Sequence, residues 1–205
     1  MLLEAWESEV AATAQATILP DGCQDLLFTA APGQAPHWAV TTLDDSAYQI
    51  DMQRGCYFKG FRLRAGVQVN AAALLASMQG LAPDAAGIED RLNSFSRLDP
   101  LVEDALSALA AQACAGGRVA HAAAQLAVHP RRLQRVMAAH TGRTAAKWLA
   151  LARVRKAARA LVAGAASADV AYELGYADQP HMQRGFRQWL GTTPKYAPTL
   201  MRGYA

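Results

Sequence analysis

A short pattern of residues occurs twice in the C-terminal half of the chain, and it limits the fold more than any other feature. In each copy a small residue precedes a turn residue by four positions: Ala123 and Ala127 in the first copy, Ala171 and Gly175 in the second. A helix-capping residue and then a run with apolar residues at helical spacing follow each turn. The small residue lets two helices touch, and the turn residue must tolerate a positive φ. The pattern therefore predicts two helix-turn-helix units, 48 residues apart.

The two copies are joined by a segment that is itself predicted to be a helix, residues 144 to 163. Trp148, Leu149 and Ala152 would form its apolar stripe, and Arg155 and Arg159 a basic face. At 1.5 Å per residue, about 20 residues span roughly 30 Å. A helix of this length would hold the two units at a fixed separation.

Charge is distributed unevenly along the chain. Residues 1–117 contain 6 Lys or Arg against 14 Asp or Glu, a net charge of −8, whereas residues 118–205 contain 14 against 3, a net charge of +11. A basic half of this kind usually binds a polyanion, most often a nucleic acid. The alternative is a solvated basic surface without a partner.

The second helix of each predicted unit exposes side chains that can recognise bases. Arginine can donate two hydrogen bonds to guanine O6 and N7, and glutamine can pair in the same way with adenine N6 and N7. A separation of about 30 Å would place the two helices about one turn of duplex DNA apart. The candidate DNA-binding residues are Arg131, Arg132, Gln134 and Arg135 in the first unit and Gln179, His181, Gln183, Arg184 and Arg187 in the second.

From Asp99 to about Pro194 the chain resembles the AraC/XylS-type transcription regulators. The most specific element is the second unit with its tail, in which a Gly175-Tyr176 pair, a capped helix with Arg184-x-Phe186 and a closing Gly191-x-Thr-Pro194 stand at the family's spacing. The resemblance implies a tandem helix-turn-helix domain that binds double-stranded DNA. It also implies a bacterial, cytoplasmic regulator, an activator or a repressor, for which RNA polymerase would be a further partner.

Two single residues depart from the family pattern or from helix preference, and the tail Pro194-Lys195-Tyr196-Ala197 lacks the Tyr-Arg pair that the resemblance implies after this proline. Ala127 stands where glycine is usual, and a positive φ there would cost about 1 kcal/mol. Gly185 lies inside the second recognition helix, where glycine costs about 0.8 to 1 kcal/mol relative to alanine. Neither departure removes a base-facing side chain.

The N-terminal half is predicted to be a small β-rich domain of residues 1–97, followed by the helical domain of residues 98–205. Asp99-Pro100 caps a new helix, which places the boundary near Ser96 to Asp99. The overall class is α+β, with a small antiparallel sheet before an all-α domain. The predicted strands are 16–19, 25–30, 37–43, 48–52 and 57–63, and the predicted helices are 71–78 and 88–95.

Two stretches of this half, Ile18 to Phe28 and Gly60 to Gly66, resemble segments of a short sensor domain that precedes the same module in some bacterial regulators. The resemblance implies that a small effector binds there or that the domain forms a homodimer. Arg62 and Arg64 would project from one face of a strand and are candidate ligands for an anionic effector, although ion pairs within the protein are the alternative. A third interpretation is dimerisation without any ligand.

Other functional classes find little support in the sequence. The three cysteines, Cys23, Cys56 and Cys114, form no C-x-x-C pair, and the five histidines show no metal-ligand spacing, so no cofactor or metal is predicted. A DNA-modifying enzyme fused to the same module is the enzymatic alternative, but no nucleophile-base pair or phosphate loop supports it. The acidic N-terminus and the absence of a long apolar run predict neither a signal peptide nor a membrane span.

Overall fold

The computed structural model describes residues 1–197 of the chain. Contacts divide these residues into two compact units. The first unit contains residues 1–16, 23–43 and 49–99, and the second contains residues 17–22, residues 44–48 and the chain from Pro100 onward. The boundary that the sequence suggests between residues 97 and 98 stays a prediction.

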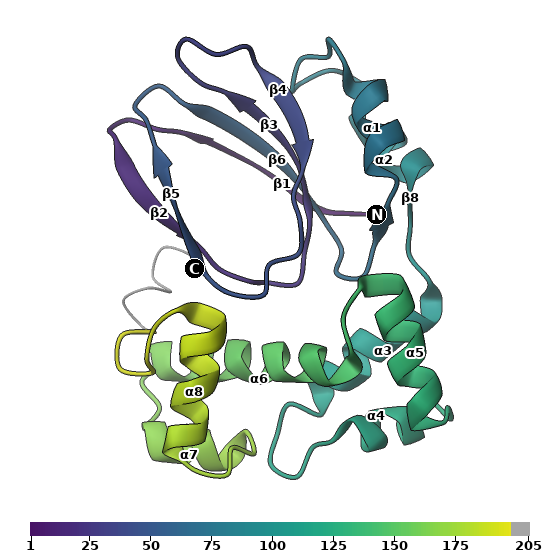
Figure 1. The fold of residues 1–205 in the computed structure, drawn as a ribbon, viewed down its shortest axis with the longest axis vertical. Helices are drawn as coiled ribbons and strands as arrows, with labels where there is room; N and C mark the ends of the chain where they lie inside the picture. Colours follow the sequence, from purple (N-terminus) through teal and green to yellow (C-terminus); the bar gives the residue numbers. More distant parts are fainter. Residues whose placement is uncertain (198–205) are drawn as a thin grey trace. The chain divides into compact units, whose positions relative to one another are not determined.

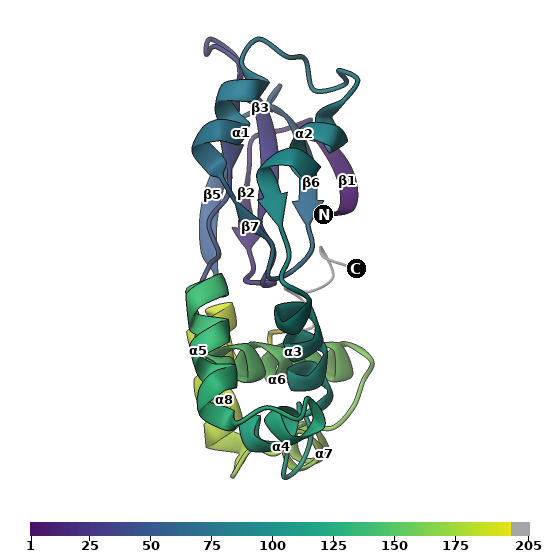
Figure 2. The same cartoon turned by 90° about the vertical axis from the view of Figure 1, so that its right-hand side faces the viewer.

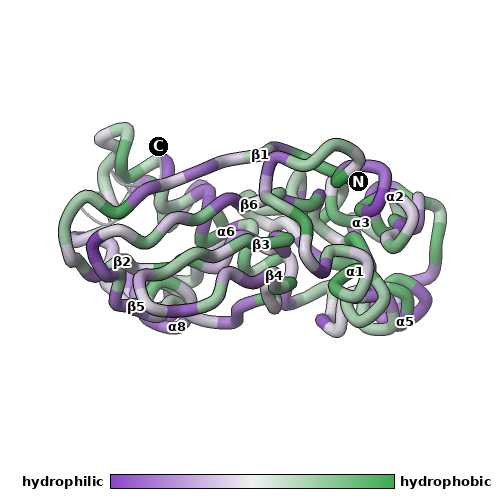
Figure 3. The backbone as a smooth tube through the Cα atoms, turned by 90° about the horizontal axis from the view of Figure 1, so that it is seen from above, coloured by the Kyte–Doolittle hydropathy of each residue, from purple (hydrophilic) through white to green (hydrophobic). Residues whose placement is uncertain are grey.

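A four-stranded antiparallel sheet with the order β1-β6-β3-β4 is the main feature of the first unit (Figure 1). A separate two-stranded sheet pairs β2 with β5, and β7 pairs with β8. The tube is green along most of β3 in Figure 3, because this inner strand contributes Leu26 and Phe28 to the core. The strands are β1 (Leu2–Glu9), β2 (Ala14–Ile18), β3 (Asp25–Ala30), β4 (His37–Val40), β5 (Tyr48–Met52), β6 (Tyr57–Leu63), β7 (Gln68–Val69) and β8 (Ser96–Arg97).

Strand β1 was not predicted from the sequence. Most of its side chains are exposed, so it lacks the alternation that marks a half-buried strand. It pairs with β6 along its length, and Gly60 of β6 makes room for Trp6, since a Cβ at Gly60 would lie 2.1 Å from the indole ring. Tertiary pairing, not local pattern, determines this strand.

Two short helices, α1 (Ala71–Met78) and α2 (Ile88–Phe95), pack beside the sheet (Figure 2). Both have the bounds that the sequence predicts. Leu74 and Met78 of α1 and Ile88 and Leu92 of α2 are buried with sheet residues in one hydrophobic core. Asn70 caps α1 by accepting a hydrogen bond from the Ala73 amide.

The second unit is helical and is built around α6 (Figure 1). α6 buries one continuous stripe that includes Trp148, Leu149, Val154 and Leu161. The predicted class, a small antiparallel β region followed by an all-α region with two helix-turn-helix units and a long joining helix, is confirmed. The helices of this unit are α3 (Pro100–Ala111), α4 (Val119–Gln125), α5 (Pro130–Thr141), α6 (Ala145–Val162), α7 (Ser167–Glu173) and α8 (Gln179–Leu190).

Candidate DNA-binding surface

The turn between α4 and α5 is closed by backbone hydrogen bonds. Ala127 has a φ of +53° and is the only non-glycine residue among those described with a positive φ. The Val128 amide donates to the Ala123 carbonyl at 3.0 Å, and the Ala127 amide donates to the Ala124 carbonyl at 3.0 Å. This pair of bonds is a Schellman motif, which ends a helix with a left-handed residue.

The turn between α7 and α8 repeats this motif. Gly175 has a φ of +73°, the Tyr176 amide donates to the Ala171 carbonyl, and the Gly175 amide donates to the Tyr172 carbonyl. The second turn is one residue longer, because three positions separate Gly175 from the cap residue Asp178, whereas two separate Ala127 from His129. Corresponding residues of the two units are therefore 48 positions apart up to the turn and 49 positions apart from the cap residue onward.

Helix α5 begins at a histidine cap and buries one face. The Nδ1 atom of His129 accepts a hydrogen bond from the Arg131 amide at 3.2 Å. Leu133 and Met137 are fully buried, while Val136 is half-buried. The opposite face exposes Arg131, Arg132 and Arg135, as the sequence predicts.

Helix α8 begins at an aspartate cap and buries the corresponding face. Asp178 accepts a hydrogen bond from the His181 amide at 2.6 Å. Met182, Phe186 and Trp189 are buried. The predicted outward residues are all exposed: Gln179, His181, Gln183, Arg184 and Arg187.

The helix pair at each end of α6 matches a known family. A family model described as a helix-turn-helix domain matches residues 122–196, which include both turns and both recognition helices, α5 and α8. Residues 122–196 form an AraC-type helix-turn-helix domain. The resemblance noted from Gly175 to Pro194 is thereby confirmed.

Solved structures provide a second comparison. The chain is similar to ToxT from Vibrio cholerae, with 7% identity over 96% of this chain and 97% of that chain and a TM-score of 0.55. It is also similar to the C-terminal domain of AraT, a response regulator from Geobacillus stearothermophilus, with 24% identity over 50% of this chain, 87% of that chain and a TM-score of 0.46. No curated protein matches the chain.

Two of the predicted base-reading side chains in the AraC-type domain also have structural roles. Gln134 is half-buried, and its Oε1 accepts a hydrogen bond from the Ala145 amide, the first residue of α6, at 3.1 Å. The Nδ1 atom of His181 accepts from the Ala177 amide at 3.2 Å, so the proton of a neutral ring lies on Nε2. His181 thus satisfies the amide of the additional residue in the second turn.

The predicted basic face of α6 is partly engaged within the same unit. Arg155 donates to the Asp21 carbonyl, and Arg159 is exposed. Arg153, which was not part of that prediction, donates to the Gly117 carbonyl. The cations at the start of α6 bind a carboxylate: Arg143 Nε lies 2.7 Å from Asp45 Oδ1, and Lys147 also pairs with Asp45. The hydrogen bond from Lys147, followed by that from Arg143, holds the pKa of Asp45 below its usual 3.8.

Gly185, which departs from helix preference, packs against the turn that precedes α8. A Cβ at this position would lie 3.4 Å from a Val154 methyl group and 3.6 Å from the Tyr176 ring, so the glycine permits close packing without being required. Tyr176 also contacts the His181 ring edge to face, with centroids 5.3 Å apart. Burial raises the pKa of Tyr176 to about 12.

Gln188 is an exposed residue of α8 that is not among the predicted DNA-binding residues. It lies one turn after Arg184 on the outward face. The apolar periodicity of α8 could have identified Gln188 from the sequence. Position 188 falls outside the buried face, which consists of Met182, Phe186, Trp189 and Leu190.

The candidate effector ligands differ in their environment. Arg62 Nε lies 3.2 Å from Asp25 Oδ1, and its guanidinium also pairs with Glu4. Arg62 therefore forms ion pairs within the protein, which was the alternative to effector binding. Arg64 is exposed just beyond the end of β6. Residues 1–197 contain no group of three or more His, Cys, Asp or Glu side chains able to hold a metal ion. In the same range, none of the helices has the length and apolar composition needed to cross a membrane.

Proposed function

We propose that the protein is a sequence-specific regulator of transcription that binds double-stranded DNA through α5 and α8. The observation that supports this most strongly is the pair of capped helices with outward Arg135 and Arg184 at equivalent positions, within an AraC-type domain. The net charge of +11 after residue 117 suits a phosphate backbone. Since chromosomal DNA is the partner, we propose a cytoplasmic location, with RNA polymerase as a second partner at the promoter.

The test is selection of bound sequences from a random duplex library, followed by affinity measurements on the selected DNA and on random DNA. Arg135→Ala and Arg184→Ala should each weaken binding to the selected sequence by about 1 to 3 kcal/mol, with little loss on random DNA. Arg159→Ala is the matched control, because Arg159 is exposed but lies outside both recognition helices. It should affect the two DNAs equally.

Salt provides a second measurement. The logarithm of the binding constant should fall by about 0.9 for each phosphate contact per logarithmic unit of salt. Failure of the wild-type chain to enrich any sequence, or a binding constant independent of salt, would argue against the proposal.

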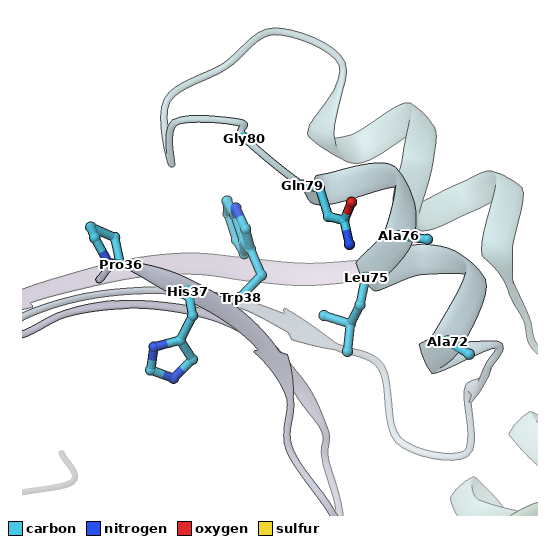
Figure 4. Close-up of a pocket in the computed structure, with 8 residues that line it drawn as sticks. All are labelled: Pro36, His37, Trp38, Ala72, Leu75, Ala76, Gln79 and Gly80. Atoms are coloured by element: carbon cyan, nitrogen blue, oxygen red, sulfur yellow. The ribbon is translucent and has the colours of Figure 1, made fainter. Parts of the chain in front are cut away.

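We further propose that the first unit binds a small effector with an apolar body. The feature that supports this is a pocket of about 450 Å³ between β4 and α1. Trp38 stands on the side of β4 that faces α1, whereas His37 points to the other side (Figure 4). A hydrogen bond of 3.1 Å from Trp38 Nε1 to the Leu81 carbonyl fixes the indole as one wall, and Leu75 and Ala76 provide an apolar opposite wall.

Thermal unfolding of the full chain in the presence of a panel of small aromatic and aliphatic compounds tests this second proposal. A bound effector raises the midpoint with concentration. Ala76→Trp should fill the pocket and abolish the shift, whereas Ala86→Trp, at an exposed site outside the pocket, should retain it. A concentration-dependent dimer in sedimentation, with no compound raising the midpoint, would favour the alternative that the first unit only forms a homodimer.

A further inference from the structure

The two recognition helices correspond residue for residue at an offset of 49. Each has twelve residues and ends at a glycine in the left-handed conformation, Gly142 or Gly191. Leu133 and Met137 of α5 correspond to Met182 and Phe186 of α8, and all four are buried. The offset therefore assigns each outward residue of one helix to a counterpart in the other.

One corresponding pair consists of two glutamines in different environments. The Gln134 amide is half-buried and bonded to the Ala145 backbone, where it satisfies a free amide at the N-terminus of α6. Its counterpart Gln183 is exposed. A bidentate bond to adenine needs both the oxygen and the nitrogen of the amide, and the oxygen of Gln134 is already engaged.

The last two turns differ as well. Ala138 and Ala139 of α5 are exposed methyl groups, whereas their counterparts Arg187 and Gln188 carry exposed polar groups. Arg184 and Gln188 are four residues apart and therefore neighbours on one helix face. Helix α8 thus presents base-reading groups over a longer stretch than α5.

We infer that the two recognition helices have unequal roles: Gln183 and Gln188 of α8 determine specificity by reading bases, while Gln134 of α5 is a positioning residue that holds the start of α6. This inference rests on the proposed function. In α5, base reading then depends on arginine, above all Arg135, the counterpart of Arg184. The expected ligand is an asymmetric duplex site, with amide-read adenines confined to the half contacted by α8.

The experiment uses the full chain, selection from a random duplex library and affinity for single-base variants of the selected sequence. Gln183→Ala and Gln188→Ala should each lose preference at discrete base pairs, by roughly five- to 150-fold, without a change in thermal unfolding. Gln134→Ala should lower the unfolding midpoint and leave base preference unchanged at a temperature where the variant is folded. Gln134→Glu keeps an oxygen for the Ala145 amide but removes the side-chain amide donor, so this variant should fold. Its negative charge should weaken binding to all DNA sequences evenly.

Several results would overturn the inference. One is altered base preference in folded Gln134→Glu or Gln134→Ala. Another is uniform weakening on every sequence by both Gln183→Ala and Gln188→Ala, which would show contact with phosphates only. These failures differ from failure of the proposed function, in which the wild-type chain itself would enrich no sequence.

Discussion

The α-carbon of Gly175 lies against the carbonyl oxygen of Cys114. A Cβ built on Gly175 would be 2.8 Å from that oxygen, and the adjacent Ala115 amide donates to the Glu173 carbonyl at 2.6 Å. The loop that follows α3 is therefore packed directly onto the end of α7. Because of this contact, the second turn should tolerate a Cβ less well than the first, although both turns have the same backbone conformation.

Gly175→Ala should destabilise the protein. The φ of +73° costs a non-glycine residue about 1 to 2 kcal/mol, and the overlap with a backbone oxygen adds to that because the loop must move. We expect a loss of about 2 kcal/mol or more in the free energy of unfolding, measured by urea denaturation. Stability equal to wild type would mean that the loop after α3 is not held in this position.

Ala127→Gly should have the opposite effect at the corresponding turn. Removing the Cβ relieves the strain of a φ of +53°, while the added freedom of the unfolded chain offsets part of the gain. The expected net change is a stabilisation of up to about 1 kcal/mol. Gly164→Ala, at a φ of +91° with open space around the α-carbon, is the control for the backbone penalty alone and should be destabilising.

Tyr176→Phe should not weaken the fold at neutral pH. The Tyr176 hydroxyl is buried and has no hydrogen-bond partner among residues 1–197, so its removal relieves a desolvated polar group. Burial raises the pKa of Tyr176 to about 12, from 10.0. The wild type should therefore lose stability relative to Tyr176→Phe as pH rises from about 10 to 12, because ionisation is easier in the unfolded chain. Denaturation of both proteins at pH 8 and at pH 11 measures this; a difference independent of pH would contradict the assignment.

Asp45→Asn should remove a stabilisation that is present at neutral pH and lost in acid. The pKa of Asp45 is lowered chiefly by the hydrogen bond from Lys147, so the carboxylate stabilises the fold above the usual pKa of 3.8, and this is lost as pH falls below it. Because the Asp45 side chain is 52% exposed, the effect should stay below about 1 kcal/mol. Unfolding free energies of wild type and variant should differ at pH 7, and the difference should shrink as the pH falls below 3.8. A gap that widens toward low pH would rule out this role.

The helical unit was the more predictable part of the fold. Periodic apolar residues, caps such as Asp178 and the glycines after α5 and α8 are local signals, and the bounds of α6 differ from the predicted 144–163 by only one residue at each end. The sheet was less predictable at its edges. β1 has few buried side chains. The predicted strand 37–43 ends at Val40, after which the Thr41 amide donates to the Asp25 carbonyl and the Thr41 hydroxyl accepts from the Asp25 amide.

Within the candidate site, the sequence predicts which side chains face outward but not what else they bind. Gln134 and Gln183 occupy the same helical phase, and only tertiary structure shows that the Ala145 amide engages the first of them. The pairing of Arg62 with Asp25, a residue 37 positions earlier, likewise depends on strand register. The roles of the nine predicted DNA-binding residues stay predictions.

The additional residue between Gly175 and Asp178 limits how the two halves of the domain can be exchanged. A chimera that transplants α7, its turn and α8 onto the first site as one block would lengthen that connection by one residue, Ala177. Grafts should therefore start at the cap residue, His129 or Asp178, so that each recognition helix keeps the linker length of its own position.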